Sequence, residues 1–275
     1  MTQQPAWPAV VLLLWALVAL TANWLPLQPD RIVLEAILHG PTWQQWLGSD
    51  DLGRPVFDRV LIGARTSFLV AGWVVSLSVV VGTLLGSTAA YLGGVWDRAL
   101  VMIVDIFMAF PGILLAIALA GLLGPGIENL VFALTLVGWV GYARLARAQV
   151  LSVKRREHVI AAQALGTGTA RIVMRHLVPL ISAPLVVEAT FGVAAVVIAE
   201  SGLSFLGLGV QPPEASWGSM IRDGVRYMLV APHLVLVPGC ALFLVVLSVN
   251  LLGDRLRDRL DVRSVRRITM QGTGK

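Results

Sequence analysis

The chain has 275 residues, of which 57% are hydrophobic and 13% charged, and its mean hydropathy is +0.80. These values exclude an ordinary soluble domain and indicate that a lipid bilayer is the solvent. The net charge of +5 is accounted for by basic loops on one side of the membrane, so it gives no reason to expect a nucleic-acid partner.

Six apolar stretches are long enough to cross a membrane. A span needs about 20 mostly apolar residues to cover roughly 30 Å of hydrocarbon. Because the stretches are continuously apolar and do not alternate, they predict helices and exclude the strands of a barrel. The predicted fold class is an all-α, polytopic membrane protein. The spans lie near residues 8–27, 66–92, 99–123, 128–150, 180–206 and 231–252.

The first stretch is expected to remain as a membrane helix. No Lys or Arg precedes it in residues 1–8, and no small-residue cleavage site follows Trp24, so it lacks the features of a signal peptide. Residues 1–65 then hold the first helix and an outer loop. Residues 66–255 are expected to form the core of transmembrane spans, with a cytoplasmic loop at 151–179, and residues 256–275 to form a tail.

Basic residues set the predicted orientation. Of the 21 Lys and Arg residues, seven fall in residues 144–176 and seven in 255–275. Short loops rich in these residues stay in the cytoplasm, which places both segments and both termini inside. The expected outer loops are residues 28–65, 124–127 and 207–230. The aromatic and charged residues of these loops are interpreted as docking or packing surface: Trp43, Trp46, Trp217, Arg222 and Asp223.

Small residues and helix breakers mark particular positions within the spans. A ridge of small side chains at a spacing of four on the second span allows another helix to approach closely, either within this chain or in a partner. Pro111-Gly112 and Pro238-Gly239 lie inside the third and sixth spans, where Pro kinks or breaks a helix, or provides a moving gate. The ridge consists of Ser78, Gly82, Gly86, Ala90 and Gly94.

Carboxylates inside spans are costly and are expected to face protein or water. Asp105 in the third span and Glu200 in the fifth are candidates for lining a pathway or for structural hydrogen bonding. Ser201 and Ser204 follow Glu200 and join it as candidate pathway residues. Glu188 either shares this role or lies near the cytoplasmic face.

The loop between the fourth and fifth spans predicts two short helices. Residues 157–165 are good helix formers, Glu157 suits the amino end of a helix dipole, and Gly166 can end the helix in the left-handed conformation. Thr169 is expected to cap a second helix that stops before Pro179. Small residues such as Ala161 would let this protrusion enter a groove on a cytoplasmic partner, and an ordinary structured loop is the alternative.

This segment resembles the EAA loop of ABC importer permeases. The family pattern Glu-x-Val-x-Ala-Ala-x-Ala-Leu-Gly, followed by Arg-Ile and basic-His-Leu-x-Pro, is matched in order. Leu180 stands where the family often has Asn. The matching residues are Glu157, Val159, Ala161, Ala162, Ala164, Leu165, Gly166, Arg171, Ile172, His176, Leu177 and Pro179.

Two further stretches resemble the peptide/nickel group, specifically its second permease. The first begins at Trp46-Leu-Gly-Ser-Asp50-Asp-Leu-Gly53-Arg54, before the second predicted span, although Pro55 replaces an Asp common in the family. The second begins at Glu200-Ser-Gly-Leu-Ser-Phe205-Leu-Gly-Leu-Gly209. The resemblance runs from about residue 44 to about residue 260.

The resemblance implies a type I ABC importer permease in the bacterial inner membrane. Its expected partners are a second related permease, two ATPase subunits, an extracytoplasmic binding protein and membrane lipid. ATP and Mg²⁺ would be bound by the ATPases, with no cofactor in this chain. Closure of the ATPase dimer would push on the coupling loop through Glu157, Ala161, Ala162, Gly166 and Arg171.

No catalysis is expected in this chain. The nearest string to a phosphate loop, which begins at Gly166, lacks the required lysine. Single histidines in different segments and the lone Cys240 give no metal-ligand set at helical spacing. A self-sufficient channel, a secondary transporter and a membrane enzyme are the other function classes. Dipeptides or oligopeptides are the first expectation for the substrate, and nickel or a metal chelate is the alternative.

Overall fold

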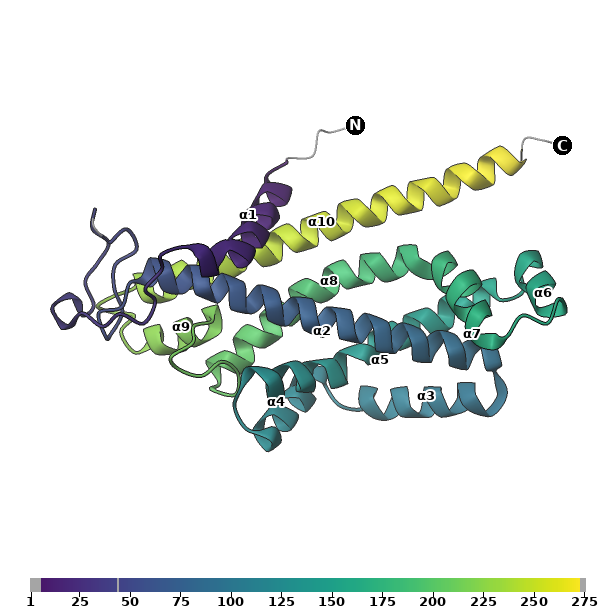
Figure 1. Ribbon diagram of the computed structural model, residues 1–275, viewed down its shortest axis with the longest axis horizontal. Coiled ribbons are helices and arrows are strands. Elements are labelled where there is room, and N and C mark those ends of the chain that lie inside the picture. Colours follow the sequence, from purple (N-terminus) through teal and green to yellow (C-terminus); the bar gives the residue numbers. More distant parts are fainter. Residues whose placement is uncertain (1–5, 44, 273–275) are drawn as a thin grey trace. The chain divides into compact units, whose positions relative to one another are not determined.

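The computed structural model describes residues 6–43 and 45–272, with side chains described as far as residue 260. In this part of the chain the regular structure is helical, apart from an isolated bridge between Ser49 and Pro55 (Figure 1). The elements are α1 (Trp7–Thr21), η1 (Ala22–Trp24), η2 (Leu34–Ala36), α2 (Val56–Leu92), α3 (Gly94–Met108), α4 (Gly112–Leu123), α5 (Ile127–Val153), α6 (Glu157–Ala164), α7 (Thr169–Ile172), the π-helical turn η3 (Val173–Leu177), α8 (Val178–Phe205), α9 (Trp217–Val225) and α10 (His233–Gly272).

Five of the described helices are long and apolar enough to span a membrane, and the broken pair α3 and α4 makes a sixth if it counts as one span. The predicted number of spans agrees with this upper count. The third span, however, is not continuous, because the helix ends at Met108 and restarts at Gly112. The break falls at Pro111, which has no N–H to donate to the preceding turn. Pro238, in contrast, lies inside α10 without ending it.

Two predictions for the segment before the fifth span were wrong. Thr169 is the first residue of α7 and makes no cap, since the N-cap position belongs to Gly168 and shows no side-chain cap bond. The helix also does not stop before Pro179. It passes through the π-helical turn into α8, and Val178 N–H bonds to the carbonyl of Val173. This wider turn changes the hydrogen-bond register just where Pro179 has no donor to contribute.

The chain divides into two compact units. Unit 1 comprises residues 1–74, 113–134 and 193–250, and unit 2 comprises residues 75–112, 135–192 and 251–275. Unit 1 is organised by two buried tryptophans. Trp15 donates from its indole nitrogen to the carbonyl of Ala64 at 2.9 Å, and its ring meets Phe68 edge-on. Trp217 donates to the carbonyl of Val60 at 3.1 Å, so α1 and α9 are both fastened to α2 by a hydrogen bond inside an apolar core.

Unit 2 is built on close contact between α2 and α5. A Cβ atom added at Gly82 would collide with the carbonyl oxygen of Trp139, and one added at Gly86 with that of Ala143. The absence of a side chain therefore lets two backbones touch. Two residues of the predicted ridge, Gly82 and Gly86, therefore pack against this chain's own α5. At these two positions the ridge serves packing within the chain and not contact with a partner.

Candidate functional site

The cytoplasmic loop forms a helical hairpin, here the coupling hairpin, defined as residues 151–179. Helix α6 begins at Glu157 and ends at a Schellman turn. Gly166 has a φ of +74°, its N–H bonds to the carbonyl of Gln163, and Thr167 N–H bonds to that of Ala162. These bonds satisfy two carbonyls at the helix end. The prediction that Gly166 ends the helix in the left-handed conformation is confirmed.

The coupling hairpin has a buried side and an exposed side. Val159, Ile172 and Leu177 are fully buried in the core of unit 2, and Ala162 is buried as well. Glu157, Ala161, Gly166 and Arg171 are exposed. Of the residues expected to transmit force, Ala162 therefore packs inward, while the other four are available to a partner.

Large apolar side chains also lie on the exposed side of the hairpin. Leu165 is 86% exposed, and Ile160 and Met174 are each more than half exposed. The rings of His158 and His176 lie 6.5 Å apart, although they come from separate segments. Figure 1 shows α6 and α7 together at one end of unit 2. An apolar surface on a polar loop is typical of a binding surface.

Asp105 lies on an exposed face of α3. Its carboxylate has no hydrogen-bond or ion-pair partner among the described residues, and it lines an open groove together with Met102 and Ile106. Nearby, α3 is fixed to α5 by a bidentate ion pair in which Arg147 donates to Asp97 at 2.6 and 2.8 Å. The groove is therefore lined by one carboxylate that is ion-paired, Asp97, and one that is not, Asp105.

Glu200 is fully buried at the centre of a hydroxyl cluster in unit 1. Its carboxyl group accepts hydrogen bonds from Ser67 on α2 at 2.9 Å, from Ser204 at 2.8 Å and from Ser201 at 3.3 Å. Ser204 in turn accepts from the backbone N–H of Val210 at 3.2 Å. Within the described part of the chain no Lys or Arg is paired with this carboxyl. Glu200, Ser201 and Ser204 are thus all buried, and the two serines bond to the Glu200 carboxyl group.

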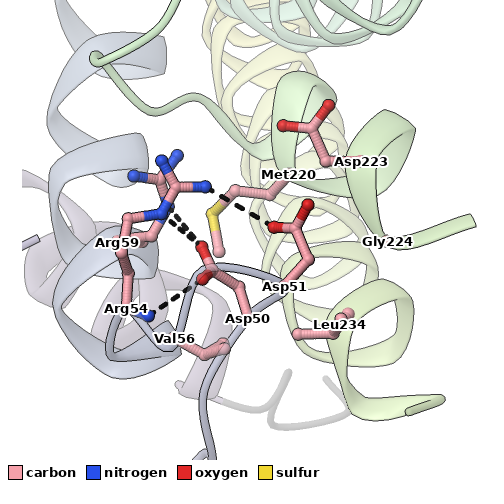
Figure 2. A pocket seen from close by; sticks show the side chains of 9 residues that line it. All are labelled: Asp50, Asp51, Arg54, Val56, Arg59, Met220, Asp223, Gly224 and Leu234. Carbon is pink, nitrogen blue, oxygen red and sulfur yellow. Dashed lines mark hydrogen bonds and ion pairs between the residues drawn. The ribbon is translucent and has the colours of Figure 1, made fainter. Parts of the chain in front are cut away.

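The outer loop before α2 folds around Asp50. This carboxylate accepts hydrogen bonds from the backbone N–H groups of Leu52 and Arg54 at 2.9 Å and from Arg54 Nε at 2.7 Å. Arg59 Nε lies 3.5 Å from the same carboxylate, and Arg59 Nη1 lies 3.4 Å from Asp30. Figure 2 shows the two guanidinium groups directed at Asp50. The buried charge is thus neutralised by two cations.

Asp51 and Asp223 complete this outer cluster (Figure 2). Burial raises the pKa of Asp51 above its ordinary range, the charge of Asp50 raises it further, and Arg54 lowers it in part. Sequence reasoning used Asp50 and Arg54 only as a signature and did not predict the cluster. The available signal was an Asp and an Arg four residues apart just before a span. Of the outer residues interpreted as docking or packing surface, Trp217 is a buried packing residue.

Comparisons with known proteins identify the chain. Residues 78–266 match the family described as binding-protein-dependent transport system inner membrane component. The chain belongs to this family. The match begins within α2 and includes the coupling hairpin and Asp223 of the outer cluster, while α1, Asp50 and Asp51 precede it.

Three relatives cover most of the chain. The nickel transport system permease protein NikC of Escherichia coli K12 is 39% identical over 92% of this chain and 91% of its own length. The glutathione transport system permease protein GsiD of Shigella boydii is 40% identical over 92% and 84%. The dipeptide transport system permease protein DppC of Alkalihalophilus pseudofirmus is 42% identical over 82% and 74%. The resemblance to the peptide/nickel group of importer permeases is confirmed.

A solved structure supports the fold. A chain of the methionine ABC transporter MetNI, in an inward-facing crystal structure, has a TM-score of 0.55 and 20% sequence identity, and the likeness covers 74% of this chain and 94% of that one. The type I importer permease fold expected from the sequence is therefore confirmed. The permease is an inner-membrane component of a binding-protein-dependent ABC importer.

Proposed function

We propose that this permease forms half of the translocation pathway for dipeptides or oligopeptides. The observation that carries the proposal is about 40% identity, over most of the chain, to permeases named for glutathione and for dipeptides. Of the three relatives at this similarity, two are named for peptides and one for nickel, which makes peptides the first candidate cargo. The first selection of the substrate would fall to the binding protein.

The complete importer would contain this permease, a second related permease, two ATPase subunits and an extracytoplasmic binding protein. Both termini and the coupling hairpin would lie in the cytoplasm, as the basic loops require. ATP and Mg²⁺ would be bound and used by the ATPase subunits, so the permease would have no cofactor and no enzymatic activity of its own. Asp105, unpaired and exposed on α3, would face the pathway or the second permease.

Coupling would pass through the exposed side of the hairpin. Ile160, Leu165 and Met174 supply apolar contact area, and the exposed Glu157 and Arg171 supply charges at its rim. Because Val159 and Ile172 are anchored in unit 2, a push on the hairpin would move α5 and α8 as rigid levers. A hairpin with a firm base and an apolar tip suits force transmission better than a flexible loop does.

Nickel, as an ion or a chelate, is the second candidate cargo, because NikC is as similar to this chain as the glutathione permease is. A stand-alone channel or secondary transporter is a weaker candidate, because the family is dependent on binding proteins.

An uptake assay in cells distinguishes these candidate functions. Cells whose only dipeptide importer contains this permease should accumulate radiolabelled Ala-Phe in an ATP-dependent manner and should not accumulate ⁶³Ni. Accumulation of nickel alone would replace the peptide assignment with the metal one. Uptake that persists after loss of the ATPase subunits would contradict the importer mechanism itself.

A further inference from the structure

Unit 2 contains a groove that none of the preceding roles uses. Its lining comes from α5, α8 and α10 and includes apolar side chains such as Leu145, Val187 and Leu260. Three polar side chains project from these walls: Gln149 on α5, Glu188 on α8 and Arg257 on α10. The groove has a volume of about 610 Å³, within the range of about 300–1,000 Å³ that is typical of small-molecule sites.

The two opposite charges in the groove are not paired with each other. Glu188 and Arg257 are both exposed, and neither has an ion-pair or hydrogen-bond partner among the described residues. The side-chain amide of Gln149 is likewise without a partner in that part of the chain. A carboxylate on a membrane-spanning helix must face protein or water, so the groove is a poor surface for lipid tails.

The groove is closed where α10 meets α8. A Cβ atom at Gly253 would lie 3.0 Å from the ring of Phe191, so the backbone of α10 rests directly on this ring. Phe191 also lines the groove. An acyl chain that entered beside Arg257 could not continue between α8 and α10 past this contact. This contact limits the groove on one side, which suits a compact ligand better than a long acyl chain.

We propose that this groove is a subsite for a zwitterionic short peptide. Glu188 would accept hydrogen bonds from the peptide's terminal ammonium group, Arg257 would bind its terminal carboxylate, and Gln149 would bond to a peptide group between them. The apolar lining residues would receive the peptide's side chains with little selectivity. The inference rests on the proposed function and deepens it, because it assigns residues of the permease that distinguish a free peptide from a blocked one.

Photo-crosslinking tests this assignment without the binding protein. The purified full-length permease in nanodiscs is irradiated with the dipeptide Ala-(p-benzoyl-Phe), and labelled segments are identified by mass spectrometry. Labelling is expected in residues 183–191 and 257–260, with competition by Ala-Phe. N-acetyl-Ala-Phe and Ala-Phe amide should each compete at least about ten-fold less well, since each lacks one charge-assisted hydrogen bond.

Two variants test which end of the peptide is recognised by each charged side chain of the groove. Glu188→Gln should remove the preference for a free amino group and keep the preference for a free carboxylate, whereas Arg257→Gln should do the reverse. Glu214→Gln and Arg226→Gln make the same charge changes at exposed positions outside the groove and should leave the competition unchanged. Both groove variants should still fold, because neither side chain is buried.

Three results would overturn the inference. These are equal competition by free and blocked peptides, displacement of the probe by phosphatidylethanolamine alone, and an unchanged preference in both groove variants. The uptake assay provides the separate readout. If wild-type cells import Ala-Phe while free and blocked peptides compete equally, the subsite is wrong and the peptide importer stands. If cells import nickel alone, the proposed function fails whatever the labelling shows.

Discussion

The coupling hairpin makes a sharp prediction at Gly166. Its φ of +74° lies in the left-handed region, and an added Cβ would meet nothing within 4 Å. Gly166→Ala therefore introduces backbone strain without a clash. The left-handed conformation costs an L-residue about 1–2 kcal/mol, which reduces the population of the native turn by roughly 5- to 30-fold relative to alternatives.

The effect should appear in coupling and not in global stability. The turn lies at an exposed tip, while the base of the hairpin is held by buried residues such as Val159 and Ile172. We expect ATP-dependent uptake to fall several-fold in Gly166→Ala with little change in the melting temperature of the purified permease. Uptake by Gly166→Asn should lie between that of the wild type and that of Gly166→Ala, because Asn tolerates the left-handed region better than Ala does.

Gly168 provides a matched control two residues away. It also has open space around its Cβ position, but its φ is −63°, which any residue adopts. Gly168→Ala should therefore leave both uptake and melting temperature unchanged. If Gly166→Ala transports as fast as Gly168→Ala and the wild type, the Schellman turn is not needed for coupling and the reasoning is refuted.

Three further predictions concern the two units. Gly86→Ala should destabilise the permease by about 1–3 kcal/mol, because the new methyl group meets the Ala143 carbonyl. Thermal unfolding in detergent measures this loss of stability. The control Gly72→Ala, in open space on the same helix, should leave the stability unchanged. Glu200→Ala leaves buried serine hydroxyls without their acceptor, at about 1–3 kcal/mol for each unpaired group, so folded yield on gel filtration should fall. Yield equal to that of the exposed control Ser182→Ala would contradict the central role of Glu200. The raised pKa of Asp51 means that the folded state disfavours the charged form of this carboxyl group. The folding stability linked to Asp51 is therefore fully present below its ordinary pKa of 3.8, and it is lost as the pH rises through the raised pKa of the folded state. Asp51→Asn should raise the melting temperature at neutral pH and have no effect at about pH 3, and an equal effect at both pH values would exclude titration of Asp51 as the cause.

Local signals in the sequence were sufficient for the spans and for much of the coupling hairpin. Hydropathy located the membrane helices. Of the two Pro-Gly pairs noted inside spans, Pro111-Gly112 marks a break, whereas Pro238 lies inside α10 without ending it. Gly166 gave the end of α6, because a glycine after a run of helix formers is a local signal. The cap at Thr169 and the stop before Pro179 were wrong, because the π-helical turn joins α7 to α8 and neither signal describes such a join.

The contacts that build the outer cluster and the Glu200 cluster could not be predicted from local patterns. Asp30, Asp50 and Arg59 come from separate parts of the outer loop and the start of α2, and Asp223 comes from α9. Ser67 and Glu200 are 133 residues apart in the chain. Tertiary packing decides such pairs, and the sequence offered only the cost of an intramembrane carboxylate as a reason to look there.

Affinity purification of the tagged, full-length permease in mild detergent tests the central claim most directly. The account predicts co-purification of a second, related permease and of ATPase subunits. It also predicts ATP hydrolysis that is stimulated by the substrate-loaded binding protein, with a stimulation that falls several-fold in the strained Gly166→Ala variant. A lone permease that moves solute in liposomes without any ATPase would contradict it.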